Sequence, residues 1–231
     1  MGKLIVLEGL DGSGKATQAQ LLFEALQQRG ERVRKVTFPD YDSSSSALVK
    51  MYLAGQFGQK PGDVNAYAAS AFYAVDRFAS FKKDWGVFYS QGGAVLADRY
   101  TTSNAVHQCS KLPRGEWDGF LAWLFDFEYE KMGIPRPDTV IYLDVAPDVS
   151  QKLMAARYHG DASKKDIHER DVAYLERSRE AAEYCVRACG WKRVACTCGG
   201  EMRGIQDISA EVLRLVLQAD AAAQTEKEAE K

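Results

Sequence analysis

Short apolar runs alternate with longer segments of helical periodicity along most of the chain. Runs of this kind, bounded by Gly, Pro, Asp or Ser, are typical of buried strands. Five of them are present, at residues 3–7, 32–38, 94–97, 139–143 and 191–197. Strands that alternate with helices form parallel sheets with right-handed crossovers. The pattern therefore predicts an α/β fold, a doubly wound five-stranded parallel sheet with helices on both faces.

The segments between these runs repeat apolar residues three and four positions apart, as one face of a helix does. They predict helices at residues 18–28, 63–85, 115–132, 149–156, 171–189 and 205–217. The serines at 43–46 could form a flexible linker, but apolar residues at helical spacing follow them at once, which favours a cap and first turn. No internal repeat or domain boundary is evident. We expect a single domain over residues 1–220 and a flexible tail over 221–231.

Composition narrows the class of protein. Hydrophobic residues make up 46% of the 231, which is ample for a core, and the formal charge of −2 argues against a nucleic-acid surface. No apolar run reaches membrane-spanning length, and the first strand begins too early to leave room for the core of a signal peptide. Five cysteines, an odd number with no export signal, indicate reduced thiols. These features predict a cytoplasmic protein that binds neither nucleic acid nor membrane.

A zinc site is the alternative role for the cysteines. Cys185 and Cys189 are four positions apart, Cys196 and Cys198 are two apart, and histidines elsewhere could join them. No C-x2-C pair is present, however, and the spacing does not match a zinc pattern. Thiols of the core or the surface are the preferred interpretation.

A glycine-rich turn connects the first strand to the first helix. Gly9, four further residues, Gly14 and Lys15 match the phosphate-loop pattern up to its last position. Backbone N–H groups of such a turn wrap a phosphate, and the lysine ammonium reaches the β- and γ-phosphates. A purely structural turn is the alternative, but the strand before it and the helix after it favour nucleotide binding. The expected nucleotide-binding residues are Gly9, Leu10, Asp11, Gly12, Ser13, Gly14, Lys15, Ala16 and Thr17.

The last position of the phosphate-loop pattern is unusual. Ala16 stands where Ser or Thr normally offers a hydroxyl to magnesium. Thr17 comes one residue later, which is ~100° around the helix. We therefore expect the Thr17 hydroxyl to face the α-phosphate rather than the metal.

A carboxylate–arginine pair ends the third strand. Ligands of open α/β sheets bind at the carboxyl ends of the strands, where Asp98 and Arg99 stand. The carboxylate can hold magnesium through water and the guanidinium can fork onto a phosphate, so both are predicted to be catalytic. A simple strand-end salt bridge is the alternative. A second pair, Asp76-Arg77, lies within a predicted helix. Without further evidence, such a pair would belong to the solvent-exposed face of that helix.

Five segments stand in order along the chain: GLDGSGKATQ (9–18), AFYAVDR (71–77), DRYTTS (98–103), PRPDTVIYLD (135–144) and DIHERDVAYLE (166–176). Their order and spacing, more than any one of them, resemble the thymidylate kinases over about residues 3–217. The resemblance implies a P-loop NTPase fold and a homodimeric nucleoside monophosphate kinase. Its members transfer the γ-phosphate of ATP to dTMP, with Mg²⁺, which gives dTDP for dTTP synthesis.

The resemblance also implies roles around the acceptor. Asp11 would reach the 3′-hydroxyl of the sugar and Arg99 the phosphate, while Asp98 would lie near magnesium. Tyr73 would stack on thymine, and Arg77 would donate a hydrogen bond to a base carbonyl.

Two further pairs of residues match the family beside the acceptor. Phe38 and Pro39 correspond to a Phe-Pro pair next to the base, joined by a peptide bond that can be cis. His107 and Gln108 occupy the place where the family often has Tyr-Gln or Phe-Gln near the sugar.

Residues 157–170 are polar, basic and contain glycine, which predicts a mobile loop. Gly12 stands where one branch of the family carries a catalytic arginine. The resemblance then places the catalytic cations in this loop, at Arg157, Lys164, Lys165 and Arg170. A closing basic lid would supply charge to the transferring phosphoryl group and exclude water. A solvated run of charge is the alternative.

Three positions depart from the family pattern. Ala16 lacks the magnesium hydroxyl, Tyr41 replaces a second phosphate-binding arginine of many members, and His107 replaces an aromatic residue. Lys50 is one of several cations that could supply the missing charge. The alternatives are thus a kinase for another deoxynucleoside monophosphate or a deoxynucleoside, or a nucleotide-binding protein with weak or no turnover.

Overall fold

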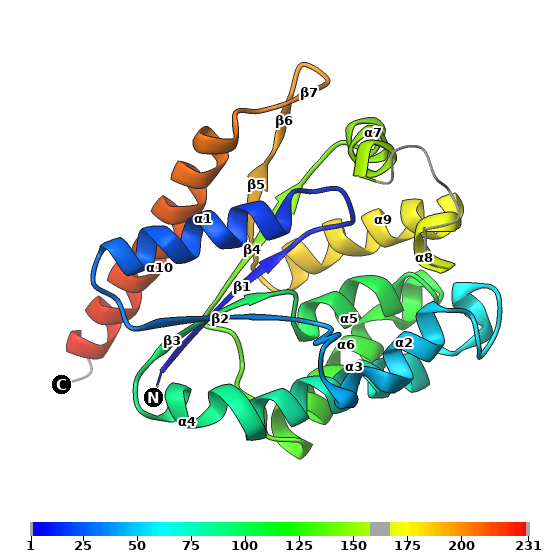
Figure 1. Ribbon diagram of the computed structural model, residues 1–231, viewed down its shortest axis with the longest axis horizontal. Coiled ribbons are helices and arrows are strands. Elements are labelled where there is room, and N and C mark those ends of the chain that lie inside the picture. Colours follow the sequence, from blue (N-terminus) through cyan, green and yellow to red (C-terminus); the bar gives the residue numbers. More distant parts are fainter. Residues whose placement is uncertain (1, 158–166, 230–231) are drawn as a thin grey trace.

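Five parallel strands form the central sheet of the protein (Figure 1). The computed structural model describes residues 2–157 and 167–229. The strands are β1 (Lys3–Glu8), β2 (Val33–Thr37), β3 (Ala94–Asp98), β4 (Thr139–Asp144) and β5 (Lys192–Ala195). Their order in the sheet is β2-β3-β1-β4-β5, and every neighbouring pair is parallel. The predicted fold class is confirmed, with β1 at the centre.

Helices cover both faces of the sheet, because successive side chains of a strand point to opposite sides. Ile5 and Leu7 of β1 pack in one core, and Leu4 and Val6 in another. One face carries α1 (Lys15–Gln28) and α10 (Ile205–Ala229). The other face carries α3 (Ala66–Ser80), α5 (Thr101–Cys109) and α9 (Val172–Ala188).

The remaining elements are short and lie around this sandwich. The further α-helices are α2 (Ala47–Leu53), α4 (Gly86–Ser90), α6 (Trp117–Phe125), α7 (Pro147–Arg157) and α8 (Ile167–Arg170). Two π-helical segments, η3 (Phe81–Trp85) and η5 (Asp126–Lys131), continue α3 and α6. Single 3₁₀ turns are η1 (Ser44–Ser46), η2 (Pro61–Asp63) and η4 (Arg114–Glu116). No helix in the described ranges is long and apolar enough to cross a membrane.

The serine-rich segment caps a helix, as the sequence predicts. The Ser43 hydroxyl accepts the Ser45 backbone N–H at 3.2 Å, and Ser44–Ser46 turn directly into α2. The side chain of Ser43 therefore satisfies one of the donors that a helix leaves open at its N-terminus.

The sequence pattern does not predict α5, because this helix has no polar face. Eight of its nine residues are buried, and only Ser103 is partly exposed. Thr, Asn, His and Gln side chains fill buried positions that an amphipathic pattern would give to apolar residues. A helix buried on all sides lacks the periodic stripe by which helices are found.

Three other segments differ from the sequence-based expectation. A two-stranded hairpin, β6 (Thr197–Cys198) and β7 (Glu201–Met202), follows β5 and was not expected. The expected loop at 157–170 is wrong at both ends, because Arg157 belongs to α7 and residues 167–170 form α8, while 158–166 lie outside the described residues. The last helix does not end near 217 but runs to Ala229, through most of the segment assigned to a tail.

Candidate active site

The carboxyl ends of β1 and β3 lie side by side. Leu7 is paired with Asp98, so the loop that leaves β1 and the dipeptide that leaves β3 emerge next to each other. The order of strands also reverses here, since β2 and β3 lie on one side of β1 and β4 on the other. Ligands of open α/β sheets bind at such points. The two strongest motifs of the sequence therefore meet at one edge of the sheet.

The glycine-rich loop turns sharply to begin α1. Gly12 has a φ of 75°, and a Cβ there would lie 2.6 Å from the Ser150 carbonyl oxygen, so glycine is required. Gly14 is the N-cap of α1, with no side-chain cap and no acidic residue in the first turn. The first N–H groups of the helix are thus available to an anion.

Lys15 folds back over this loop. Its ammonium donates to the Leu10 carbonyl at 2.9 Å and lies 3.4 Å from the Ser13 hydroxyl. Burial and repulsion from Arg99 lower the pKa of Lys15 to about 8. The cation is therefore held beside the loop amides, where phosphate oxygens are expected.

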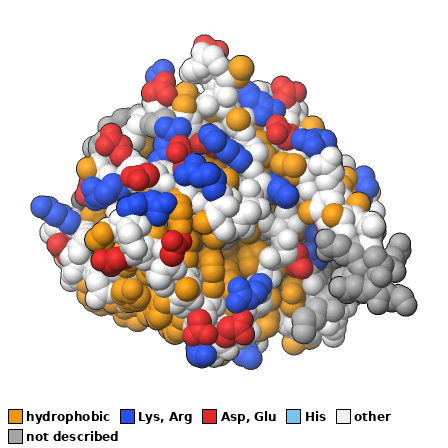
Figure 2. Space-filling model, turned by 180° about the vertical axis from the view of Figure 1, so that it is seen from behind, with side chains coloured by type: hydrophobic (Ala, Val, Ile, Leu, Met, Phe, Trp, Pro, Cys, Tyr) orange, Lys and Arg blue, Asp and Glu red, His pale blue; other side chains and the backbone are white. Residues whose placement is uncertain are grey.

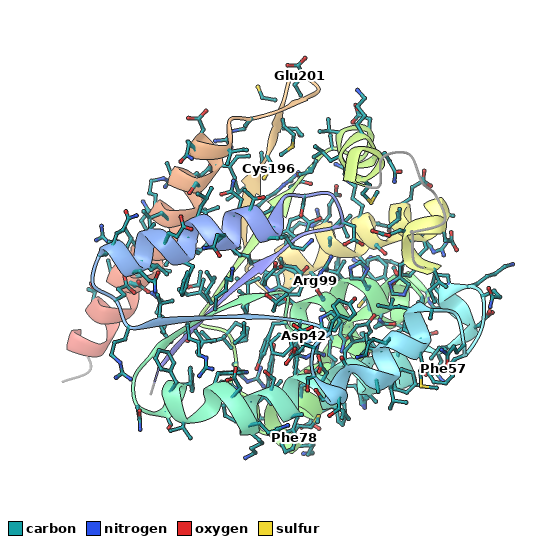
Figure 3. The ribbon with its side chains drawn as sticks, in the orientation of Figure 1. Asp42, Phe57, Phe78, Arg99, Cys196 and Glu201 are labelled. Carbon is teal, nitrogen blue, oxygen red and sulfur yellow. The ribbon has the colours of Figure 1, made fainter. Side chains whose placement is uncertain are left out.

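Arg99 has a backbone conformation that residues other than glycine rarely adopt. Its φ of 67° is the one positive value among the non-glycine residues of the described ranges. A left-handed residue costs about 1–2 kcal/mol. The Arg99 N–H donates to the Leu7 carbonyl at 3.0 Å, and Figure 3 shows the residue in the interior, between α1 and α3. Backbone strain of this kind tends to occur at functional positions.

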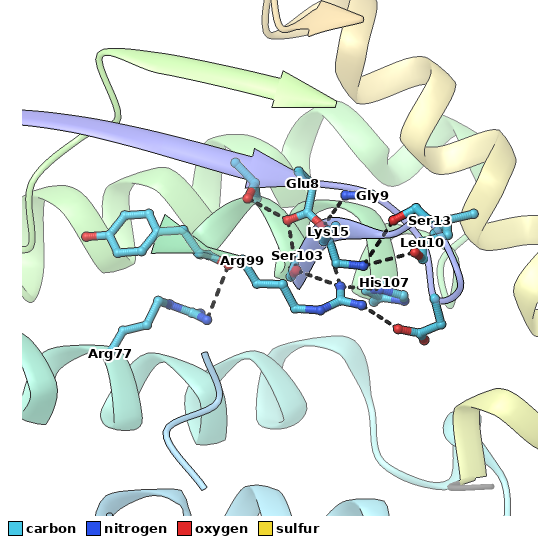
Figure 4. A network of polar contacts seen from close by, with 12 residues as sticks. Glu8, Gly9, Leu10, Ser13, Lys15, Arg77, Arg99, Ser103 and His107 are labelled. Carbon is cyan, nitrogen blue, oxygen red and sulfur yellow. Dashed lines mark hydrogen bonds and ion pairs between the residues drawn. The ribbon is translucent and has the colours of Figure 1, made fainter. Parts of the chain in front are cut away.

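Two carboxylates hold the Arg99 guanidinium (Figure 4). Its Nη2 donates to Asp11 Oδ1 at 2.5 Å, and its Nη1 lies 3.4 Å from Glu8 Oε1 and 3.1 Å from Ser103 Oγ. Burial opposes the charge of Arg99, but the two carboxylates outweigh it and raise the pKa. Burial likewise opposes ionisation of Asp11, yet Arg99 and Lys15 hold the pKa of this carboxyl well below its usual range. Asp11 is therefore an anion at neutral pH.

Two cavities meet at this ion pair. The first, of about 580 Å³, is lined by the phosphate loop from Asp11 to Thr17 together with Asp98 and Glu169. The second, of about 90 Å³, is lined by Leu53, Tyr73, Ser103, Asn104, His107, Gln108 and His168. Both share Asp11, Pro39, Tyr41 and Arg99. We call them the donor and acceptor cavities.

The acceptor cavity brings together most residues that the sequence assigned to the acceptor. Tyr73, Pro39, His107 and Gln108 line it, and the Phe38-Pro39 bond is cis as expected. Its aromatic and amide side chains suit a flat heterocycle and its edge atoms. Its volume of about 90 Å³ is below the ~300 Å³ at the lower limit of ligand pockets, and it adjoins the larger donor cavity at Asp11 and Arg99.

His107, which lines this cavity, carries a buried donor. Its Nε2 lies 3.4 Å from Arg99 Nη1 and must be the acceptor, because a guanidinium only donates. Burial and the Arg99 charge lower the pKa of His107 to about 3, so the ring is neutral with its proton on Nδ1. That Nδ1 is buried and has no hydrogen-bond partner among the residues that the structure describes. A buried donor without a partner is costly and is a candidate for ligand binding.

Comparison with known proteins identifies the family. Residues 7–196 match the family model described as thymidylate kinase. The chain belongs to the thymidylate kinase family. Members of this family are nucleoside monophosphate kinases, so the chain is a phosphotransferase.

Relatives and a solved structure extend this comparison. Thymidylate kinase of Mycobacterium tuberculosis (strain ATCC 25618 / H37Rv) is 30% identical over 191 residues, which is 81% of this chain and 87% of the relative. Human thymidylate kinase is 31% identical over 148 residues, 62% of this chain and 61% of its own. A structure of thymidylate kinase from Candida albicans covers 95% of this chain and 92% of its own, with a TM-score of 0.68. Its identity is 18%, so that likeness concerns the fold.

Arg77, which the thymidylate kinase resemblance assigns to the base, lines neither cavity. Its Nε and Nη2 donate to the two carboxylate oxygens of Glu128 at 2.7 and 2.6 Å, and both side chains are almost fully buried. Thr101 and Asn104 also donate to Glu128. Only Nη1, which makes a long 3.4 Å bond to the Tyr100 carbonyl, has capacity left for a base. The main contact of Arg77 in this structure is therefore its buried ion pair with Glu128.

Magnesium ligands can be assigned only in part. Asp98 lines the donor cavity, as do Ala16 and Thr17. No group of three or more His, Cys, Asp or Glu side chains suited to a metal ion occurs among the described residues. Magnesium often binds through one or two carboxylates with waters and substrate phosphates, so Asp98 fits the ion despite Ala16.

The basic residues expected to form a lid are beyond what the structure describes. Lys164 and Lys165 lie outside the described residues, and the side chains of Arg157 and Arg170 are not described. Next to them, His168 and Glu169 of α8 reach the cavities.

Sequence reasoning missed Glu8, Asn104 and His168. Asn104 and His168 line the acceptor cavity. Glu8 does not line it but forms an ion pair with Arg99, which does. Glu8 had a signal in the sequence, because it is a charged residue directly after the apolar run of a central strand. Asn104 lies in the unpredicted α5, so its position could not be inferred.

Replacing Arg77 by Met should lower the free energy of unfolding by about 3–5 kcal/mol, because it leaves the Glu128 carboxylate buried without its cation. Urea denaturation measures this change. Lys131→Met is the matched control, since Lys131 and Asp126 form an exposed pair whose loss should cost less than about 1 kcal/mol. Equal stability of the two variants would show that the Arg77–Glu128 pair does not support the fold.

Proposed function

We propose that the chain transfers the γ-phosphoryl group of ATP to dTMP and releases dTDP and ADP. The observation that carries the proposal is the junction of the donor and acceptor cavities at Arg99 and Asp11. A phosphoryl group can pass in line between two nucleotides only if their phosphates meet at one point. Family membership supplies the reaction class, and this junction gives the point of transfer.

The phosphate loop holds the donor. Backbone N–H groups from Asp11 to Lys15 and the N-terminus of α1 bind the β- and γ-phosphates, and the Lys15 ammonium neutralises the charge that moves with the γ-phosphoryl group. Gly12 allows the loop to close on Ser150 with no side chain between. Thr17 faces the same cavity and can reach the α-phosphate.

Arg99 and the residues around it hold the acceptor. Its guanidinium binds the monophosphate, while Asp11 accepts the 3′-hydroxyl of the sugar and Tyr73 stacks on the base. His107 donates through Nδ1 to an acceptor atom of the nucleoside, a role supported by the absence of any other partner for that atom. Together these contacts fix the attacking phosphate oxygen beside the donor cavity.

Two further groups complete the proposed site. Asp98 would hold magnesium, which would supply positive charge against the donor phosphates. The cations Arg157, Lys164 and Lys165 stabilise the charge of the transition state, a proposal that rests on the basic sequence between α7 and α8.

Because Tyr41 and His107 depart from the family pattern, the acceptor could be a different deoxynucleoside monophosphate. A kinase for another deoxynucleoside monophosphate would use the same donor cavity and Arg99. The exposed Ala16 beside the loop favours a different alternative, a nucleotide-binding protein with little turnover. The two experiments that follow separate these from dTMP kinase activity.

Coupled ADP-release assays with dTMP, dUMP, dCMP and thymidine test the acceptor. We expect kcat/KM for dTMP to exceed that for dUMP by about 10-fold or more, the usual effect of one methyl group in a fitted pocket. Thymidine should not be phosphorylated, because it gives Arg99 no phosphate to bind. Equal rates with all three monophosphates would refute dTMP as the preferred acceptor.

Lys15→Met should lower kcat by at least about 100-fold, because it removes a cation from the transferring phosphoryl group. The unfolding free energy should change by less than about 1 kcal/mol, since Lys15 bonds only to its own loop. Lys83→Met, at an exposed position of η3, is the control for expression and assay. Full activity of Lys15→Met would overturn the loop assignment, and a wild-type chain that binds ATP without producing ADP would favour the low-turnover alternative.

An apolar surface on α3 and α6 is the proposed contact of a homodimer. Tyr67 packs on Trp123, which stacks on Phe127, and Val75 of α3 is 47% exposed. Figure 2 shows hydrophobic side chains gathered over the lower part of the back of the molecule. Patches of this kind mark interaction sites on soluble proteins.

Val75→Asp should convert a dimer into a monomer, because a carboxylate buried in an apolar contact has no partner. Light scattering after size exclusion gives the mass directly. Val87→Asp, at an exposed position of α4, controls for the added charge. A wild-type mass of one chain, or a Val75→Asp protein that stays dimeric, would exclude this contact.

A further inference from the structure

Glu8 is a buried carboxylate with a complete set of donors. It is 1% exposed and ends the central strand β1. Oε1 accepts the Gly9 N–H at 2.9 Å and faces Arg99 Nη1 at 3.4 Å. Oε2 accepts the hydroxyls of Thr102 and Ser103 at 2.7 and 2.8 Å. Four donors from three segments leave this carboxylate no freedom to move.

Consecutive residues of β1 hold both ends of Arg99. The Leu7 carbonyl accepts its backbone N–H, and the Glu8 carboxylate pairs with its guanidinium. The left-handed backbone of Arg99 lies between these two contacts. Because β1 is hydrogen-bonded on both sides, it is a rigid support for a strained residue.

Asp11, the second carboxylate that binds Arg99, is more exposed than Glu8. It lies on the glycine-rich loop, its side chain is 22% exposed, and it lines both cavities. It binds Nη2 of Arg99, whereas Glu8 and Ser103 bind Nη1. One nitrogen of the guanidinium is therefore held by β1 and α5, and the other by the glycine-rich loop.

The size of the acceptor cavity indicates which contact must change. Its volume of about 90 Å³ is below the ~300 Å³ of a typical ligand pocket, and Asp11 and Arg99 form part of its wall. Replacing Asp11 by a phosphate at Nη2 keeps the charge of Arg99 paired and opens the wall. Replacing Glu8 would strip a buried carboxylate of its cation, which is far less favourable.

We propose that Glu8 is the positioning residue for the acceptor phosphate. It fixes Nη1 and the left-handed backbone of Arg99, so that Nη2 exchanges the Asp11 carboxylate for the phosphate of the incoming nucleoside monophosphate. Asp11, once released, is left beside the sugar. This inference rests on the proposed function, because it requires a phosphorylated acceptor at Arg99.

Binding of dTMP and thymidine to Glu8→Gln tests the proposal. The amide keeps the shape of Glu8 but loses the charge that orients Arg99, so the affinity for dTMP should fall by about 10-fold or more. Thymidine makes no phosphate contact, and its affinity should change by less than about 3-fold. The preference for dTMP over thymidine, measured by calorimetry, therefore falls in the variant. Binding of a non-hydrolysable ATP analogue with Mg²⁺ should stay within the same ~3-fold of wild type.

Thr102→Val is the matched control. Thr102 donates to the same carboxylate but contacts neither Arg99 nor the two cavities. It should lower stability and leave the preference for dTMP over thymidine unchanged. A merely structural role of Glu8 would make Glu8→Gln behave in the same way, which would overturn the proposal.

Glu8→Asp provides a second variant if Glu8→Gln does not fold. It keeps the charge but withdraws it by one methylene group, so the preference for dTMP should fall here too. An unchanged preference in either folded variant contradicts the proposal. If the wild-type chain itself binds dTMP no better than thymidine, the acceptor assignment fails instead, whatever Glu8 does.

Discussion

The site at the carboxyl ends of β1 and β3 depends on how the central strand, β1, holds Arg99. The strand order puts the ends of β1 and β3 side by side, and the sharp turn after Asp98 requires a left-handed residue there. Leu7 and Glu8 secure that residue through its backbone and its side chain. Because Glu8 also accepts the Gly9 N–H, one carboxylate sets the start of the phosphate loop and the position of the acceptor arginine. Donor and acceptor geometry are thus fixed by the same strand.

Carboxylates outnumber cations at this edge of the sheet. Lys15 and Arg99 face Glu8, Asp11 and Asp98 around the donor cavity. Nucleotide phosphates bring further negative charge, so either a carboxylate must withdraw or cations must arrive. Asp11 does not become neutral, because Arg99 holds its pKa well below the usual range. The proposed release of Asp11 from Arg99 and the proposed cations of residues 157–165 would both reduce this excess of negative charge.

Local patterns explain why part of this site could be predicted. The strands, the glycine loop and Asp98-Arg99 are visible because each is a short run whose spacing determines its structure. The Arg77–Glu128 pair joins residues 51 positions apart, and no local pattern reveals it. The α5 helix is hidden because buried Asn104, His107 and Gln108 replace an apolar stripe. What the sequence missed depends on contacts between distant segments, and two of the missed residues, Asn104 and His168, line the acceptor cavity.

Arg99 is the one cation among the described residues that line both cavities. Tyr41, which also lines both, does not supply a second positive charge. His107 cannot replace that charge, because burial and Arg99 lower its pKa to about 3. A neutral His107 adds a donor without repelling Arg99. In the proposed function Arg99 binds the acceptor phosphate, so the buried carboxylate of Glu8, which pairs with Arg99, would contribute to how the site holds that phosphate.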